Sequence, residues 1–190
     1  MTDLWRGHKV RLRAVDVSDF DAFHADSHDM AVQRLGNETN LPLSAKLLRE
    51  RLEKPAPHDT QNCWLAVESL EHGCLVGSVS VHDANRRHRN FKYGVAIFRE
   101  YWRRGFAIEA ISLLLRYYFR ELGYRRVTAV VYSFNTASLA LHEQMGFVRE
   151  GVLRQSLFTQ GRFFDEVVFG LLASEFEALE SALPEEASLD

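Results

Sequence analysis

A short basic stretch after an apolar strand is the first part of the sequence with clear chemical potential. Residues 95–98 read as the end of a strand, and Arg103, Arg104 and Gly105 follow just before an amphipathic helix. The first N–H groups of a helix have no partners within it and carry partial positive charge. Glycine allows close backbone approach, and guanidinium groups add charge-assisted hydrogen bonds. The stretch predicts a diphosphate site, although a plain strand-to-helix turn with exposed arginines explains these residues equally well.

A second polar group lies on the helix expected from Asn135 to Met145. At about 100° per residue, Asn135, Ser138 and His142 fall on one side of this helix. The opposite side is expected to face the core and comprises Ala137, Ala140, Leu141 and Met145. Asn135 also suits a helix N-cap and Gly146 a C-cap, so capping competes with ligand binding as the explanation.

Hydrophobic periodicity predicts the elements that would position these side chains. Strands are expected at residues 8–15, 62–67, 75–81, 91–98, 127–132, 148–158 and 164–172. Helices are expected at 17–35 with Ser18 as N-cap, at 44–53, 105–122 and 135–145, and as a last turn at 173–179. This order predicts antiparallel pairing early and parallel or mixed pairing later. The expected fold class is α/β, with a central twisted mixed sheet of about six or seven strands flanked by helices.

Length and composition favour one globular domain over residues 1–180, followed by a disordered acidic tail at 181–190. The net charge of -3 argues against a nucleic-acid partner. Cys63 and Cys74 are the only cysteines and form neither a disulfide framework nor a metal cluster, so no metal is expected. The absence of a long apolar stretch argues against a membrane partner, and a cytoplasmic protein is expected.

One decapeptide resembles the acetyl-CoA-binding segment of the GNAT superfamily of N-acetyltransferases, and it reads YWRRGFAIEA from Tyr101 to Ala110. Trp102 replaces the Gln or Arg of the wider superfamily, which is typical of the branch with ribosomal-protein N-terminal (alanine/serine) acetyltransferases. Residues 135–151 resemble the second coenzyme motif of that branch, and residues 10–13 and 161–165 also match it in order. The resemblance spans nearly the whole domain.

The resemblance implies a GNAT-like acyl-CoA N-acyltransferase fold in which the expected strands at 93–98 and 127–132 splay apart around the pantetheine. Backbone amides of residues 103–107 would hold the diphosphate, and the strand at 93–98 would bind the pantetheine arm and face the thioester carbonyl. The residues implied to bind acetyl-CoA are Val95, Ile97, Arg99, Arg103, Arg104, Gly105, Phe106, Ala107, Asn135 and Ser138.

Acetyl transfer to an amine requires a base for the ammonium, stabilisation of the oxyanion and a proton for the departing thiolate. In the branch that this chain resembles, the serine matching Ser138 protonates the thiolate. Many other family members carry a tyrosine at the position of His142. Ser138 is therefore the first candidate for the proton donor, and His142 is the second.

The general base is not identified by the sequence. Several relatives place a glutamate two residues before a strand glycine, and the residue at that distance from Gly94 is Lys92. A lysine cannot act as that carboxylate does. His82, Asp83, His88 or a water relay remain open, and Asp165 suits a hydrogen-bonded turn better than a catalytic role.

The acceptor is also open at this stage. A peptide N-terminal amine is the first choice by family analogy, and a small amine, polyamine or antibiotic is the alternative. The acidic side chains of the two early helices could attract an amine, or could simply be solvated. A non-catalytic acyl-CoA sensor is the alternative from another class, and a homodimer remains an option.

Overall fold

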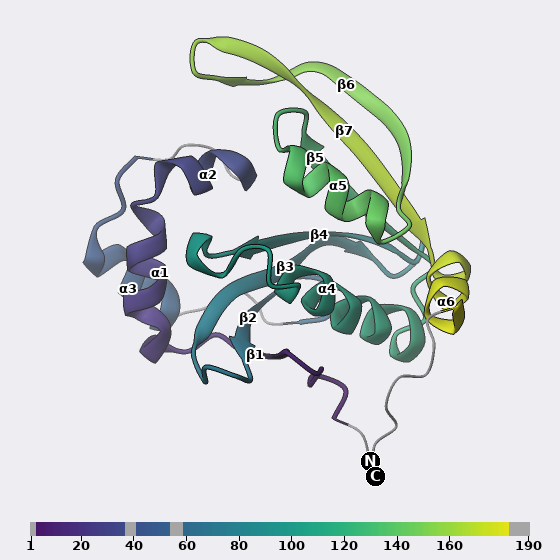
Figure 1. Cartoon of the computed structure of the whole chain (residues 1–190), viewed down its shortest axis with the longest axis horizontal. Helices are drawn as coiled ribbons and strands as arrows, with labels where there is room; N and C mark the ends of the chain where they lie inside the picture. Colours follow the sequence, from purple (N-terminus) through teal and green to yellow (C-terminus); the bar gives the residue numbers. More distant parts are fainter. Residues whose placement is uncertain (1–2, 37–40, 54–58, 183–190) are drawn as a thin grey trace.

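The computed structural model describes residues 3–36, 41–53 and 59–182. Seven strands form one mixed sheet in the order β1-β2-β3-β4-β5-β7-β6 (Figure 1). The strands are β1 (Val10–Ala14), β2 (Cys63–Ser69), β3 (Leu75–Asn85), β4 (Asn90–Ile97), β5 (Arg126–Tyr132), β6 (Val148–Thr159) and β7 (Arg162–Leu172). All neighbouring pairs are antiparallel except β4 and β5. The expected fold class and number of strands are therefore confirmed.

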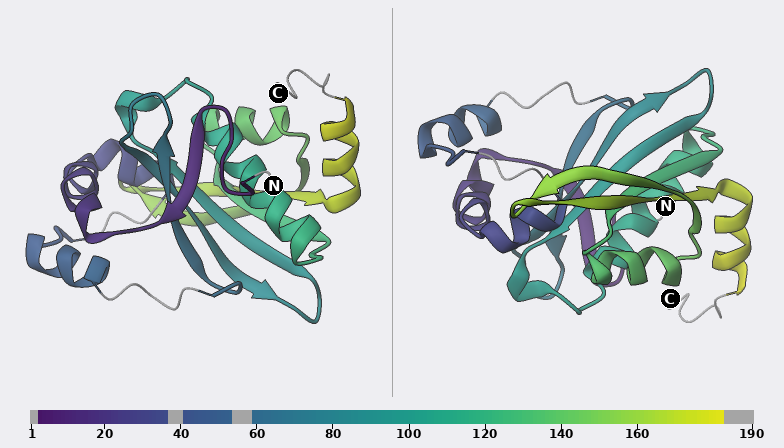
Figure 2. Two further views of the ribbon diagram at one scale, coloured as in Figure 1. Left: turned by 90° about the horizontal axis from the view of Figure 1, so that it is seen from below. Right: turned by 90° about the horizontal axis from the view of Figure 1, so that it is seen from above.

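Helices cover both faces of this sheet (Figure 2). They are α1 (Phe20–Ser27), α2 (Met30–Gly36), α3 (Ala45–Glu53), α4 (Phe106–Arg116), α5 (Thr136–Gln144) and α6 (Ala173–Ala182). On one face, Ile111 and Leu114 of α4 join the main core with Phe91 of β4. Alternate strand residues point to the other face, where Ala66 packs with Phe23 of α1.

The strands β4 and β5 separate after a short paired region. Their parallel pairing runs from Asn90 and Arg126 to Lys92 and Thr128. Beyond these positions β4 continues to Ile97 and β5 to Tyr132, and no pairing joins these two described segments. The expected splay is confirmed, and it leaves main-chain groups of β4 without sheet partners.

The first long helix expected at residues 17–35 is wrong, because the structure contains a 3₁₀ turn (Val17–Asp19), α1 and α2 in its place. The Asp29 carboxylate accepts hydrogen bonds from the amides of Ala31 and Val32, so it caps α2 and interrupts the helix. The first N-cap is Asp16 rather than Ser18.

Two later helices also differ from expectation. The helix expected at 105–122 ends as α4 at Arg116 and continues as a π-helical turn (Tyr117–Glu121), while Gly123 follows with positive φ as a C-terminal cap. The helix α6 extends to Ala182, past the single turn expected at 173–179, and Glu180 in this extension pairs with Arg116 and Arg120. The expected tail therefore begins within α6, and residues 183–190 lie outside the described residues.

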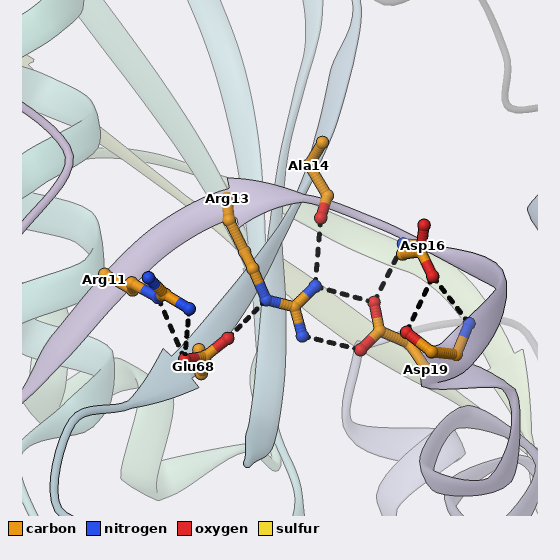
Figure 3. Close-up of polar contacts among 7 residues, drawn as sticks. Arg11, Arg13, Ala14, Asp16, Asp19 and Glu68 are labelled. Carbon is orange, nitrogen blue, oxygen red and sulfur yellow. Dashed lines mark hydrogen bonds and ion pairs between the residues drawn. The ribbon is translucent and has the colours of Figure 1, made fainter. Parts of the chain in front are cut away.

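An ion-pair network fixes the junction between β1 and the first helical turn (Figure 3). The Arg13 guanidinium donates to both Asp19 carboxylate oxygens, at 2.7 and 2.9 Å, and its Nε donates to Glu68 at 2.5 Å. Asp19 is only 5% exposed and also accepts from the Asp16 amide. The pKa of Arg13 is raised, first by its hydrogen bond to Asp19 and then by the one to Glu68.

Candidate active site

The loop before α4 has the geometry of an anion site. Gly105 is the N-cap of α4 and has a φ of 82°, a left-handed conformation that favours glycine. No side chain caps this helix end, so the N–H groups of its first turn remain available to a ligand. Phe106 points into the core and Ala107 is half-buried, so both would serve a ligand through their main chains.

Lys9 is a component of this loop that the sequence did not reveal. Its Nζ donates to the Arg104 carbonyl at 3.1 Å and would lie 3.1 Å from a Cβ added to Gly105. The Glu109 carboxylate holds this segment in place by accepting hydrogen bonds from the amides of His8, Lys9 and Val10, at 2.7–2.8 Å. Because β1 and α4 are distant in sequence, no local pattern could indicate this extra positive charge.

The three arginines of the loop have different partners. Arg99 forms an ion pair with Asp29 at 2.6 Å. Arg104 donates to the Glu100 carbonyl and to His72, both at 3.2 Å. Arg103 is exposed and forms no ion pair or side-chain hydrogen bond within the described ranges. Arg103 is therefore the guanidinium most available to a bound anion.

The main chain of β4 faces the splay on alternate residues. The Phe98 amide donates to the Val76 carbonyl on the β3 side at 2.9 Å. Because main-chain groups alternate along a strand, those of Val95 and Ile97 point to the opposite side, where β5 has separated. The Trp102 indole donates to the Ile97 carbonyl at 2.6 Å, which leaves Val95 with the more accessible carbonyl.

The polar residues of α5 lie close together, but the predicted orientation of the helix is only partly correct, since Leu141 and Met145 pack against the core as expected. His142 is only 3% exposed, whereas Ala137 and Ala140, expected to face the core, are exposed. The predicted polar stripe therefore faces inward. A histidine can be buried here because both its ring nitrogens have partners: Tyr93 Oη at 2.8 Å and the Ser138 carbonyl at 2.7 Å.

Asn135 acts as the N-cap, and its polar atoms are already engaged. Its side-chain oxygen accepts from the Ser138 amide at 3.1 Å, and its Nδ2 donates to the Leu35 carbonyl of α2 at 2.8 Å. It thereby ties α2 to the start of α5. Ser138 is half-buried, and its hydroxyl lies 3.4 Å from His142 Nδ1.

The candidate bases differ in their surroundings. Lys92 donates to Asp83 at 3.0 Å, which lowers the pKa of that carboxylate. His88 lies in the β3–β4 turn, at the paired end of β4. His82 is opposite Lys92 in the β3–β4 ladder, next to the last paired position before the splay, and burial lowers its pKa.

Asp165 has the turn-stabilising role that the sequence favoured. Its Oδ1 accepts a hydrogen bond at 2.8 Å from the amide of Gln155, and Gln155 has a φ of 53°. This bond stabilises an irregularity in the pairing of β6 with β7.

The acids of the early helices separate into paired and unpaired groups. Asp19 and Asp29 have arginine partners, whereas Asp26 accepts from the Gln33 side-chain amide at 3.2 Å and has no cationic partner in the described chain. Burial, followed by the charges of Asp29 and Glu100, raises the pKa of Asp26 to about 6. Glu38 lies outside the described residues.

Comparisons with known proteins identify the family. A family model described as an acetyltransferase (GNAT) domain matches residues 9–148. The chain belongs to the GNAT acetyltransferase family. A similar relative is the SPbeta prophage-derived uncharacterized N-acetyltransferase YokL of Bacillus subtilis (strain 168), which is 39% identical over 91% of this chain and 95% of YokL. This GNAT protein is an acetyl-CoA-dependent N-acetyltransferase.

Two further likenesses concern the acceptor. YdaF of Bacillus subtilis (strain 168), provisionally named a ribosomal N-acetyltransferase, is 33% identical over 57% of this chain and 59% of YdaF. A crystal structure of spermidine N-acetyltransferase from Vibrio cholerae, in complex with CoA and spermine, has a TM-score of 0.78 at 27% identity. The match between the two structures covers 88% of this chain and 98% of the spermidine enzyme's chain.

Acetyl-CoA fits the residues of this GNAT site. An anionic diphosphate suits the uncapped start of α4, with Lys9 nearby and Arg103 available, and a pantetheine amide suits the unpaired main chain of β4. The bound coenzyme supplies the acetyl group and the thiol leaving group. No helix in the part of the chain that the structure describes is long and apolar enough to cross a membrane.

Proposed function

We propose that this GNAT enzyme acetylates a small, positively charged amine, with a polyamine as the first substrate class to test. The observation that carries acetyl transfer is the uncapped start of α4 beside the unpaired main chain of β4. The half-buried Asp26 supports a cationic acceptor, because a carboxylate short of positive partners binds an ammonium group well. The likeness to the spermidine enzyme supports the same substrate class.

A peptide N-terminal amine is the second candidate. It is supported by Trp102 in the coenzyme segment and by the likeness to YdaF over part of the chain. The deciding experiment measures thiol release from acetyl-CoA with spermidine, spermine, monoamines, aminoglycosides and peptides with free N-termini. Highest kcat/KM for polyamines supports the proposal, highest kcat/KM for peptides replaces it, and coenzyme binding without turnover indicates the non-catalytic alternative.

The proposed coenzyme loop has a matched control on the same helix. Gly105→Asp places a negative charge beside the expected diphosphate, whereas Gly123→Asp places it at the other end, at a similar positive φ with nothing within 4 Å of the added Cβ. We expect calorimetry to show at least a tenfold loss of CoA affinity for Gly105→Asp alone. Equal affinity in both folded variants would contradict the assignment.

Ser138 is the proposed proton donor to the departing thiolate. Support comes from its half-buried hydroxyl on α5 and from the polar contacts that fix its backbone. Ser138→Ala should lower kcat by about 10²–10⁴-fold if chemistry limits the rate, because general acid catalysis acts in the transition state. An unchanged kcat would reject this role. His142 is the weaker candidate, because its ring is buried and its nitrogens are engaged.

His82 is the proposed general base among the residues considered. Its lowered pKa favours a neutral imidazole, which can accept a proton at pH 7, and it neighbours the start of the splay. His82→Gln should lower kcat/KM at pH 7 and remove the corresponding limb of the pH profile, whereas His88→Gln should change neither. If both variants match the wild type, a water relay replaces His82.

A second copy of this chain is the proposed partner of β6. Among the described strands it pairs only with β7, and Val152 and Leu153 on its alternate sides are half exposed. Long exposed apolar edges favour pairing with another strand. An antiparallel two-fold pairing centred on Val152 would place Glu150, which already pairs with Arg126 of its own chain, opposite Arg154 of the second copy.

Sedimentation velocity tests this partner. We expect a dimer for the wild type and for Leu47→Lys, which alters an exposed leucine on α3, and a monomer for Val152→Lys. A monomeric wild type would reject the partner.

The two free cysteines fit a reducing compartment, which supports the cytoplasm as the proposed location.

A further inference from the structure

Three polar side chains of β4 and α5 form a buried chain of contacts beside the splay. The Tyr93 hydroxyl lies 2.8 Å from His142 Nε2. His142 Nδ1 lies 2.7 Å from the Ser138 carbonyl and 3.4 Å from the Ser138 hydroxyl. Tyr93 and His142 are both in the core, so water does not compete for these contacts.

The two partners of the His142 ring, the Ser138 carbonyl and the Tyr93 hydroxyl, together set its tautomer. A carbonyl oxygen can only accept, so Nδ1 must bear the ring hydrogen and donate it. Burial lowers the pKa of His142 and raises that of Tyr93, so the imidazole is neutral and the phenol keeps its proton. In a neutral imidazole with Nδ1–H, Nε2 is an acceptor, and the Tyr93 hydroxyl must therefore donate to it.

This arrangement also constrains the Ser138 hydroxyl. Its oxygen faces the Nδ1–H group at the long distance of 3.4 Å, where it can act only as an acceptor. The hydroxyl hydrogen must then point away from His142. The Ser138 amide is separately bonded to Asn135, so the backbone that carries this hydroxyl is fixed as well.

We propose that Tyr93 is a positioning residue for acetyl transfer: by donating to Nε2, its hydroxyl acts with the Ser138 carbonyl to hold His142 in the Nδ1–H tautomer, which orients the Ser138 hydroxyl hydrogen outward. This inference rests on the proposed role of Ser138. When the tetrahedral intermediate collapses, the C–S bond breaks, the sulfur leaves with the electron pair, and it takes the Ser138 hydroxyl proton. Solvent water then returns a proton to the serine oxygen.

A tautomer measurement tests the structural half of the proposal without relying on activity. Long-range ¹H–¹⁵N spectra of ¹⁵N-histidine-labelled protein distinguish Nδ1–H from Nε2–H imidazole. We expect His142 to be the Nδ1–H form in the wild type and a mixture of tautomers in Tyr93→Phe, which removes only the hydroxyl. An Nε2–H form in the wild type, or an unchanged spectrum in the variant, overturns the proposal.

Kinetics test the catalytic half, with Tyr118→Phe as the matched control. Tyr118 is another buried tyrosine, whose hydroxyl bonds to the Thr60 carbonyl at 3.1 Å. Tyr93→Phe should lower kcat about tenfold with KM for acetyl-CoA changed less than twofold. Tyr118→Phe should leave kcat within twofold of the wild type. An equal loss in both variants indicates general destabilisation and overturns the positioning role.

The double variant separates this proposal from the role of Ser138. If Tyr93 acts through Ser138, then Tyr93→Phe should slow the Ser138→Ala enzyme by less than twofold. A further tenfold loss overturns the positioning role while leaving Ser138 as the donor. If Ser138→Ala alone keeps the wild-type kcat, the proton-donor assignment fails and the catalytic purpose of Tyr93 fails with it, although the tautomer measurement can still confirm the hydrogen-bond chain.

Discussion

Asp19 and Asp26 are neighbouring acids with opposite surroundings. Asp19 is nearly inaccessible, yet a bidentate Arg13 and a backbone amide satisfy its carboxylate (Figure 3). Asp26 is more accessible but faces two other acids and has a single amide donor from Gln33. The comparison shows that pairing distinguishes them better than burial: the fully paired acid stabilises the fold, and the underpaired acid is the better candidate for binding a cation.

The largest expected effect comes from removing the partner of Asp19. Arg13→Ala should lower the free energy of unfolding by about 3–5 kcal/mol, because it leaves a buried carboxylate without its cation. Urea denaturation is the measurement. Arg11→Ala is the control, since Arg11 is about half exposed and pairs only with Glu68, and it should cost less than about 1 kcal/mol. Equal losses of stability in the two variants would contradict the view that the buried Asp19 depends on its arginine more than an exposed ion pair does.

The second effect concerns acceptor binding at Asp26. Asp26→Asn should raise KM for a polyamine by about tenfold, because a charge-assisted hydrogen bond contributes about 1.5–3 kcal/mol, with little change in kcat. Asp21→Asn, an exposed acid on the same helix, should leave KM unchanged. Because the pKa of Asp26 is about 6, wild-type KM should fall as the pH rises from 5 to 7. A pH-independent ratio of variant to wild-type KM would contradict the assignment.

The same substitution, Asp26→Asn, should have a smaller effect on stability, and in the opposite direction: it weakens acceptor binding but should raise the free energy of unfolding. The folded-state pKa of Asp26 is raised, so its contribution to stability is fully present below the unfolded pKa and is lost as the pH rises through about 6. Asp26→Asn should therefore be more stable than the wild type at pH 7, by roughly 0.5–1 kcal/mol given its solvent exposure. The two proteins should have nearly equal melting temperatures at pH 4. A less stable variant at pH 7 would mean that Asp26 is structural.

The smallest effect is expected at the exposed ion pair of Asp29. Arg99→Ala should change the free energy of unfolding by about 0.5 kcal/mol, because half-exposed ion pairs contribute little and Asp29 still caps α2. Thermal unfolding in low and high salt measures it. A loss as large as that of Arg13→Ala would show that exposure does not separate the two arginine–aspartate pairs.

The order of the strands and the conformation of the loop before α4 were predictable because their signals are local. Alternating apolar residues indicated the strands, and Gly105 between an apolar strand and an amphipathic helix indicated an anion site. The break before α2 was missed, because the Asp29 cap was not distinguished from an ordinary helical residue. Helix propensity alone could not decide between one continuous helix and two helices separated at Asp29.

The parts of the site that were missed depend on contacts between distant residues. The inward orientation of α5 depends on Tyr93, 49 residues before His142, which makes burial of the imidazole favourable. The positive charge of Lys9 at the loop depends on a contact 95 residues away. Neither contact leaves a periodic pattern in the sequence, so the inward position of His142 could not be predicted.

The Glu109 carboxylate, which accepts hydrogen bonds from the three consecutive amides of residues 8–10, also affects how the chain folds. Glu109 is separated from those amides by 99–101 residues, so the contact closes one of the longest loops in the domain. Closing such a loop costs chain entropy before any contact rewards it, which makes high-contact-order features slow to form. We therefore expect the N-terminal strand and the loop before α4 to become ordered together and late in folding, so that a nascent chain gains the proposed diphosphate site only after the first strand docks on α4.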